Sequence, residues 1–218
     1  MSLALYFDPI SSPCRATLAL LKLSKIPHEE NFVSLAEQQN RSGEYLKINP
    51  RGLVPVLDDN GFIVQEHEAI LRYLAKTRPE AQEYYPDDVK TQALIDQYYP
   101  FHYSEMIPKL LHYFYGYNHF PQAGAFNKEE ARKGVNEALK KFDEIYLQDK
   151  KYLAGNKITI ADLTAVNQIF QVYFMADIDL KEFPRVKAYV DRSLENPVLL
   201  EVSQPLREIA KKLRGNSQ

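Results

Sequence analysis

The segment FDPISSPCRATLALL, residues 7–21, brings together side chains that could do chemistry. It holds two adjacent hydroxyls, Ser11 and Ser12, the only cysteine of the chain, Cys14, and Arg15. A strand-like run gives way to a helix-like one at this point. A hydroxyl just before a helix can donate a hydrogen bond to an anion that the helix N-terminus also stabilises. This junction is therefore our candidate catalytic site, with the serines and Cys14 as competing groups.

Short strand-like and helix-like runs alternate around that junction. Residues 3–7, LALYF, predict a buried strand, and apolar residues then recur at helical spacing over 13–25. Asn60 and Gly61 between two β-rich runs predict a hairpin. The other expected elements are strands over 30–35, 53–59 and 61–66 and helices over 43–49 and 67–78. The order β-α-β-α-β-β-α predicts a small mixed sheet flanked by helices.

The rest of the chain has helical patterns only. Residues 89–120 carry Pro100 and Pro108, each of which should interrupt a helix. Residues 128–148 are amphipathic, and Thr159 with Asp162 forms a capping-box pattern before an apolar helix. We expect an α/β domain over residues 1–79, a polar linker over 80–88 and an all-helical domain over 89–218.

Composition excludes several classes of function. The net charge of -2 provides no field that favours nucleic acid or an anionic membrane. One cysteine excludes an internal disulfide and the usual zinc spacings, which fits a reducing compartment. No N-terminal signal pattern or membrane span is visible, and the histidine spacing matches no metal motif. We expect a cytoplasmic protein with no metal, nucleic-acid or membrane partner.

Four motifs in this order resemble the cytosolic glutathione transferases, most closely the serine-using theta and delta classes. The motifs are SSPCR (11–15), KINPRGLVPVL (47–57), QEHEAILRYL (65–74) and LAGNKITIADL (153–163). The resemblance spans nearly the whole chain. It implies a thioredoxin-like N-terminal domain, an all-helical C-terminal domain and a homodimer. It also implies a detoxifying enzyme that conjugates the thiolate of its co-substrate, glutathione, to small hydrophobic electrophiles.

The resemblance selects Ser11 as the catalytic hydroxyl, because the family's serine lies two residues before Pro-Cys-Arg. The serine would donate a hydrogen bond to the glutathione sulfur and so stabilise the thiolate. Ser12 remains a neighbouring alternative. Cys14 offers a different mechanism, since some relatives of this fold form a mixed disulfide with glutathione. A lone cysteine among apolar residues is usually inert, which favours Ser11.

The resemblance also implies a set of glutathione-binding residues. The main chain of Val54, with Leu53 beside it and a cis peptide bond before Pro55, would pair with the cysteinyl part of glutathione. Asn40 stands where the family has a histidine that meets the glycyl carboxylate, and Arg41 or Arg51 could supply charge there.

Glu66 and His67 match the family's Glu-Ser pair, which binds the γ-glutamyl end at a helix N-terminus. Histidine here replaces the usual serine. We hypothesise that the His67 imidazolium contacts the glutamyl carboxylate, in which case glutathione affinity should weaken above about pH 7. The alternative is a histidine with no ligand role.

The electrophile should bind against the second domain. Residues 97–120 contain nine aromatic side chains, and aromatic and methionine side chains suit an apolar pocket. Tyr103, Met106 and Tyr113 are the predicted wall residues, although the same side chains could simply form the core. The main alternative function is a non-catalytic binding or scaffolding protein of the same fold. Electrophile preference stays open.

Overall fold

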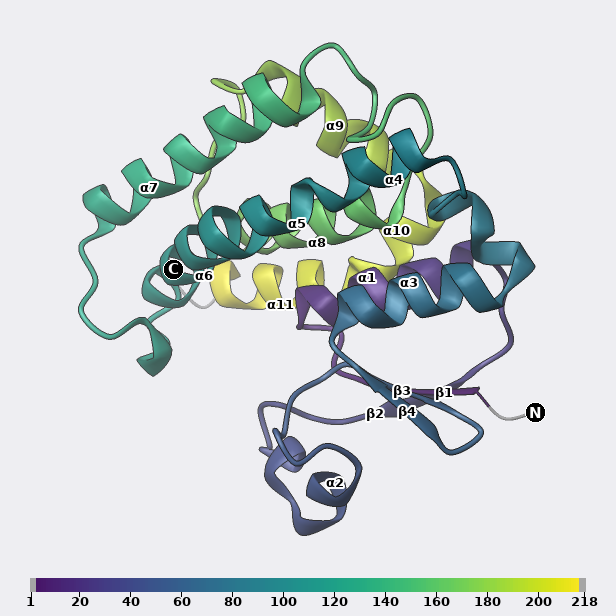
Figure 1. The fold of residues 1–218 in the computed structure, drawn as a ribbon. Coiled ribbons are helices and arrows are strands. Elements are labelled where there is room, and N and C mark those ends of the chain that lie inside the picture. Colours follow the sequence, from purple (N-terminus) through teal and green to yellow (C-terminus); the bar gives the residue numbers. More distant parts are fainter. Residues whose placement is uncertain (1–2, 216–218) are drawn as a thin grey trace.

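A four-stranded mixed sheet forms the N-terminal part of the molecule, which we describe for residues 3–215 of a computed structural model. Its strand order is β2-β1-β3-β4, with β2 parallel to β1 and the other pairs antiparallel. In Figure 1, α1 and α3 cover one face of this sheet, and α2 lies on the other. The elements are β1 (Leu3–Phe7), α1 (Ser12–Leu23), β2 (Glu29–Phe32), α2 (Gly43–Ile48), β3 (Val56–Asp59), β4 (Phe62–Gln65) and α3 (His67–Thr77). The predicted order of elements is confirmed.

The β3–β4 connection shows why the sequence predicts this part well. Asn60 and Gly61 have φ angles of 54° and 89°. Positive φ at both central residues is what a tight two-residue hairpin requires, and Asn-Gly tolerates it. The turn sets the register, in which Asp59 lies opposite Phe62. The hairpin is therefore determined locally.

A layer of helices packs on α1 and α3 from the side opposite the sheet (Figure 1). The α-helices are α4 (Val89–Asp96), α5 (Tyr98–Phe101), α6 (Ile107–Tyr117), α7 (Lys128–Lys141), α8 (Ile160–Met175), α9 (Pro184–Glu195), α10 (Pro197–Val202) and α11 (Gln204–Gly215). Two π-helical turns, η3 (His102–Met106) and η5 (Phe142–Leu147), interrupt this layer. None of the helices within residues 3–215 is both long and apolar enough to cross a bilayer.

The two parts are joined by a packed connection rather than by the polar linker that the sequence suggests. Residues 79–84 form a 3₁₀ helix, η2, in which Ala81 and Tyr84 are buried. The predicted interruptions near Pro100 and Pro108 are present, because α4, α5, η3 and α6 follow one another as separate helical pieces. Proline removes a backbone donor, which allows the helix to change its pitch there.

Helix α8 runs through the middle of the helical layer and is buried along almost its whole length. Its N-terminus depends on Asp162. The Asp162 carboxylate accepts hydrogen bonds from Leu153 N (2.8 Å), Thr159 N (2.8 Å) and the Tyr189 hydroxyl (3.2 Å). Burial raises the pKa of Asp162 to about 6, and these hydrogen bonds oppose the shift. The predicted capping box is confirmed.

Replacing Asp162 by alanine should destabilise the fold severely. The change leaves several buried donors without an acceptor, and each such group costs about 1–3 kcal/mol. We expect the free energy of unfolding in urea to fall by about 3 kcal/mol or more. The matched control is Asp88→Ala, which removes the exposed N-cap of α4. Equal losses in the two variants would contradict the buried role of Asp162.

Candidate active site

Asp8 organises the turn between β1 and α1, where the candidate hydroxyls lie. Its carboxylate accepts hydrogen bonds from Ile10 N and Leu35 N, both at 2.9 Å. Its main-chain oxygen accepts one from Ser11 N at 3.0 Å. Asp8 is only 5% exposed, so this arrangement is held inside the protein. The turn therefore presents Ser11 in a defined position at the start of α1.

Ser11 is the N-cap residue of α1, with extended backbone angles of φ -80° and ψ 124°. Its hydroxyl makes no capping hydrogen bond to the helix. The hydroxyl oxygen of an N-cap serine usually accepts a hydrogen bond from a backbone N–H of the first turn, so the absence of this bond is notable. The Ser11 side chain also lines a cavity between the two parts of the molecule. Ser11 therefore lies at the positive end of α1 with a hydroxyl that does not cap the helix.

Ser12 has a different environment. It is 7% exposed, and its hydroxyl donates a hydrogen bond of 2.7 Å to Oε1 of Gln168 on α8. Because a hydroxyl has a single proton to donate, Ser12 cannot give that proton to a ligand without breaking this bond. The neighbouring serines thus differ in their surroundings: Ser12 joins α1 to α8, whereas Ser11 lines the cavity and its side chain hydrogen-bonds the Cys14 thiol within α1.

Arg15 is completely buried and has no carboxylate among its hydrogen-bond acceptors. Nη1 donates to the main-chain oxygens of Pro9 (2.9 Å) and Ile10 (2.8 Å), which precede Ser11. Nη2 donates to Asn167 O (2.8 Å) and Gln171 Oε1 (2.7 Å) on α8. Burial lowers the pKa of Arg15 to about 9, so the side chain remains charged at neutral pH.

Cys14 is fully buried. Burial raises the pKa of its thiol to about 12, although hydrogen bonds from the Asp8 main chain and the Ser11 side chain oppose the shift. The thiolate is the reactive form of cysteine, so this thiol is suited to packing rather than to exchange with a disulfide. The environment disfavours the alternative mechanism based on Cys14.

The cavity beside Ser11 has a volume of about 410 Å³. Residues from the β1–α1 turn, α6, the segment after α6 and α8 line it, so both parts of the molecule contribute. None of its lining side chains is charged. The lining residues are Ile10, Ser11, Ser12, Pro13, Leu35, Ala36, Ile107, Leu111, Phe114, Tyr115, Phe120, Gln122, Gln168 and Gln171.

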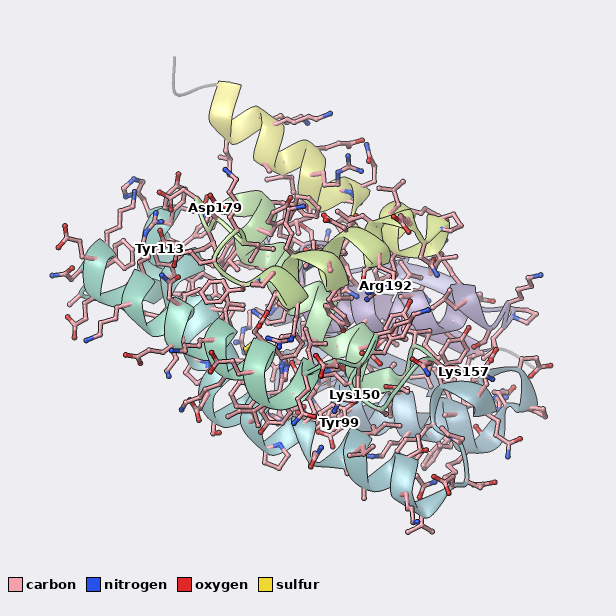
Figure 2. The ribbon with its side chains drawn as sticks, turned by 90° about the horizontal axis from the view of Figure 1, so that it is seen from above. Tyr99, Tyr113, Lys150, Lys157, Asp179 and Arg192 are labelled. Atoms are coloured by element: carbon pink, nitrogen blue, oxygen red, sulfur yellow. The ribbon has the colours of Figure 1, made fainter. Side chains whose placement is uncertain are left out.

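The predicted wall residues Tyr103, Met106 and Tyr113 do not line this cavity. Met106 and Tyr113 have no exposed surface, and the Tyr113 hydroxyl donates a hydrogen bond to Asp177. Figure 2 shows Tyr113 next to the segment that carries Asp179, at one end of the helical layer. Tyr103 instead lies beside His67, with ring centroids 6.3 Å apart. Other residues of the same segment line the cavity instead, because its aromatic residues divide between the core and the cavity.

The loop before β3 contains the cis peptide bond that the resemblance implied, between Val54 and Pro55. The main-chain oxygen of Leu53 accepts hydrogen bonds from the Tyr45 hydroxyl (2.7 Å) and Asn49 Nδ2 (2.8 Å). Leu53 itself is 43% exposed, and Val54 is half-buried. These bonds hold the loop in place while its edge stays accessible.

Asn40 is buried, and Nδ2 donates a hydrogen bond of 2.7 Å to Gly52 O. Gly52 has a φ of 62°, and a Cβ there would lie 2.8 Å from Asn40 O and from Arg41 Nη1. The Asn40 amide therefore ties the turn at residues 39–41 to the loop before Val54. Arg41 is exposed at the same place.

Glu66 and His67 stand at the N-terminus of α3, as predicted. Glu66 has a φ of 67°, and its exposed carboxylate forms an ion pair with Arg51. His67 is only 4% exposed, and its Nε2 is buried without a hydrogen-bond partner. Burial lowers the pKa of His67 to about 4, so its ring is neutral at pH 7. This environment disfavours the hypothesis of an imidazolium–carboxylate contact, because the ring packs against His102 and Tyr103.

Comparison with known proteins agrees with this geometry. The N-terminal domain of glutathione S-transferases matches residues 10–77, and their C-terminal domain matches residues 103–197. Glutathione S-transferase theta-1 of Bos taurus is 31% identical over 201 residues, covering 88% of this chain and 82% of the relative. Glutathione S-transferase D7 of Anopheles gambiae is 29% identical over 194 residues, covering 88% and 86%.

The crystal structure of human glutathione transferase theta-2, in complex with glutathione and an unknown ligand, is also similar. It superposes with a TM-score of 0.90 at 28% identity and covers 99% of this chain and 91% of that one. The chain belongs to the glutathione S-transferase family. The resemblance to the theta and delta classes is thereby confirmed, as are the fold class, the transferase activity and glutathione as co-substrate.

Within this glutathione transferase, the most informative residues that the sequence prediction missed are Gln168 and Gln171. They lie three residues apart on α8, and both reach the cavity. A signal was present, because two glutamines on one face of a largely apolar helix must find hydrogen-bond partners when buried. No group of three or more metal-ligating side chains occurs in the described part of the chain.

The pH dependence of stability tests the burial of His67. Its pKa of about 4 lies below the ordinary value of 6.5, so the unfolded chain binds the proton more readily. This contribution to stability is complete above about pH 6.5 and is lost as the pH falls toward 4. Urea unfolding should show that His67→Gln loses less stability than the wild type over this window. If the free energy of unfolding fell equally with pH in the two proteins, the buried neutral state of His67 would be contradicted.

A ligand measurement separates this role from glutathione binding. S-methylglutathione has no ionisable thiol, so its affinity reports the carboxylate and other contacts without any contribution from thiol ionisation. We expect its Kd to stay constant between about pH 6 and pH 8, because a group with a pKa near 4 does not titrate there. A loss of affinity above about pH 7 that disappears in His67→Gln would restore the imidazolium hypothesis.

Proposed function

We propose that this transferase conjugates glutathione to small hydrophobic electrophiles, with the Ser11 hydroxyl donating a hydrogen bond to the glutathione thiolate. The observation that carries the proposal is the contrast between the two serines. Ser11 lines the cavity and its hydroxyl makes no capping bond, whereas the Ser12 hydroxyl donates to Gln168. The hydroxyl need not lose its own proton to act.

The required energy is within reach of these groups. A free thiol has a pKa of about 8.5, and ionising most of it at pH 7 needs a shift of roughly 2 units, or about 2.7 kcal/mol. A hydrogen bond to a charged acceptor contributes about 1.5–3 kcal/mol. The N-terminus of a helix adds a few tenths to about 2 kcal/mol. The charge of Arg15, buried beneath the turn that carries Ser11, acts in the same direction.

Glutathione would then extend from Ser11 along the loop before β3. We assign the cysteinyl contact to the main chain of Val54, beside Leu53 and Pro55, which is accessible at the edge of the sheet. The free N–H groups at the start of α3, after Glu66, would receive the γ-glutamyl carboxylate. This role for His67 needs only its main chain, so the burial of its ring is compatible with it.

We assign binding of the glycyl carboxylate of glutathione to the turn around Asn40. One N–H of the Asn40 amide is already engaged with Gly52 O, but the amide has a second N–H. Arg41 is exposed beside it and can add a charged donor. In this proposal Asn40 positions the turn and Arg41 supplies most of the attraction.

The electrophile occupies the uncharged cavity beside Ser11. Phe114, Tyr115 and Phe120 form one aromatic group there, with ring centroids 5.2–6.1 Å apart. An apolar cavity that opens next to the thiolate favours hydrophobic electrophiles, which fits detoxification. We place this activity in the cytoplasm, because the single cysteine suits a reducing compartment.

Replacing Ser11 by alanine should reduce kcat/KM for glutathione conjugation at pH 7 by tenfold or more. The variant loses the donor to the sulfur anion, so the pKa of the bound thiol should rise by about one unit or more. Ultraviolet absorbance of the bound thiolate measures that pKa, and calorimetry with S-methylglutathione measures binding. Binding should change little, because the other contacts remain.

Ser12→Ala is the matched control for this experiment. It removes a hydroxyl one residue away but leaves the Ser11 hydroxyl in place, so the thiol pKa should stay near its wild-type value. A raised thiol pKa in Ser12→Ala together with normal turnover in Ser11→Ala would reverse the assignment.

Assembly into a homodimer is a further part of the proposal. Large side chains such as Phe62 (58% exposed) and Tyr103 (42% exposed) are available for an interface. Light scattering coupled to size exclusion should give twice the mass of one chain at micromolar concentration. A single-chain mass over the whole concentration range would argue against a stable dimer.

A further inference from the structure

Two buried glutamines, Gln168 and Gln171, lie in the wall of the Ser11 cavity and carry amide N–H groups that no described residue accepts. They are 2% and 3% exposed, respectively. A buried primary amide normally has partners for both its oxygen and its nitrogen. Here each oxygen has a partner on α1, whereas neither nitrogen has a hydrogen bond to any described residue.

The orientation of the Gln171 amide follows from its partner. Oε1 accepts a hydrogen bond of 2.7 Å from Arg15 Nη2. A guanidinium has donors only, so it must meet the amide oxygen and not the amide nitrogen. The Gln171 nitrogen therefore points away from Arg15. This nitrogen has no partner among the described residues but is not sealed from solvent, and Gln171 lines the cavity. We infer that its N–H groups are directed into the cavity.

Gln168, one helical turn earlier, shares the occupied oxygen but not the accessible nitrogen, because its own nitrogen is sealed from solvent. Its Oε1 accepts the hydrogen bond from Ser12, and its Nε2 is buried with no partner. The hydrogen bond from Arg15 also polarises the Gln171 amide, which makes its N–H groups better donors. The buried charge of Arg15 thus acts on the cavity through Gln171, although Arg15 itself does not line the cavity.

The rest of the cavity wall offers little that would compete for these donors. Its other residues are apolar or aromatic, apart from Ser11, Ser12, Tyr115 and Gln122, and none is charged. A neutral ligand with an oxygen acceptor would satisfy an otherwise unpaired donor. An apolar ligand would leave that donor unpaired, which costs free energy in a buried site.

We propose that Gln171 selects neutral aromatic electrophiles that carry a carbonyl oxygen conjugated to the reactive carbon–carbon double bond. The inference rests on the proposed function, because it places the electrophile next to the glutathione thiolate. Gln171 contacts the substrate oxygen in this scheme. Arg15 is a positioning residue that orients and polarises the Gln171 amide.

The reaction is an addition in which all atoms are retained. The thiolate forms a carbon–sulfur bond at the β-carbon, and the π electron pair of the double bond moves so that the carbonyl oxygen becomes an enolate oxygen. A proton from water then adds to the α-carbon and gives the saturated thioether. Negative charge therefore develops on the oxygen that Gln171 contacts, and a fixed donor at such an oxygen favours the transition state.

A pair of electrophiles with and without the oxygen tests this scheme. Benzylideneacetone has the conjugated carbonyl, and benzyl chloride has a similar ring but no oxygen. Gln171→Met removes the donor at similar length. We expect the ratio of the two kcat/KM values, ketone over chloride, to fall tenfold or more, because removing one such donor commonly costs at least this much. Any general disturbance of Ser11 affects both substrates and cancels in the ratio.

Gln122→Met is the matched control, since it makes the same change at an exposed glutamine that lines the same cavity. Its ratio should stay within twofold of the wild type. Gln171→Glu is the second variant, because a carboxylate keeps an acceptor for Arg15 but has no N–H to donate. Its ratio should fall as well. An unchanged ratio in both Gln171 variants would overturn the inference.

A binding measurement separates this inference from the proposed function. Benzylacetone is the saturated analogue of the ketone and cannot react, so calorimetry in the presence of S-methylglutathione measures its affinity without turnover. Gln171→Met should weaken that affinity at least fivefold, whereas the affinity for butylbenzene should change less than twofold. Equal affinities for benzylacetone in the variant and the wild type would overturn the donor contact. Failure of the wild type to conjugate either electrophile would overturn the proposed function instead.

Discussion

The arrangement of this protein depends on one buried cation, the guanidinium of Arg15. Burying a guanidinium without a carboxylate partner is costly unless other oxygens accept its hydrogen bonds. The oxygens come from the turn that carries Ser11 and from α8, so one side chain joins the two parts of the molecule at the candidate site. The same contact that connects the domains therefore also sets the position of the catalytic hydroxyl.

This connection explains how adjacent serines acquire different roles. Successive residues at the start of a helix point in different directions, so only one of them can face α8. Ser12 does so and donates its proton to Gln168, which leaves Ser11 toward the cavity. Cys14 points into the core, where burial favours the neutral thiol. The role of each side chain in SSPCR thus depends on its direction relative to α8 as much as on its chemistry.

Sequence patterns predicted the N-terminal part well because its determinants are local. The Asn60–Gly61 turn and the alternating apolar runs define the sheet, and the Thr159–Asp162 pair defines the start of α8. The cis bond before Pro55 followed from family resemblance and is confirmed. The inward orientation of His67 could not be predicted from the sequence, because a ring at a helix N-terminus can turn either to a ligand or inward. Only the packing of η3 against α3 decides between these directions.

The electrophile cavity was harder to predict for a different reason. A π-helical turn contains more residues than an α-helical turn, so the face that follows it is rotated relative to an uninterrupted helix. Tyr103 and Met106 lie within such a turn, η3, whereas the cavity-lining Ile107 and Leu111 belong to α6, which follows it. Helical spacing across 97–120 therefore cannot identify the residues that face Ser11. The glutamines of α8 were missed for a different reason. Their helix is regular, but the sequence alone does not show the partners on α1 that orient the two amides and leave the Gln171 donors for a ligand.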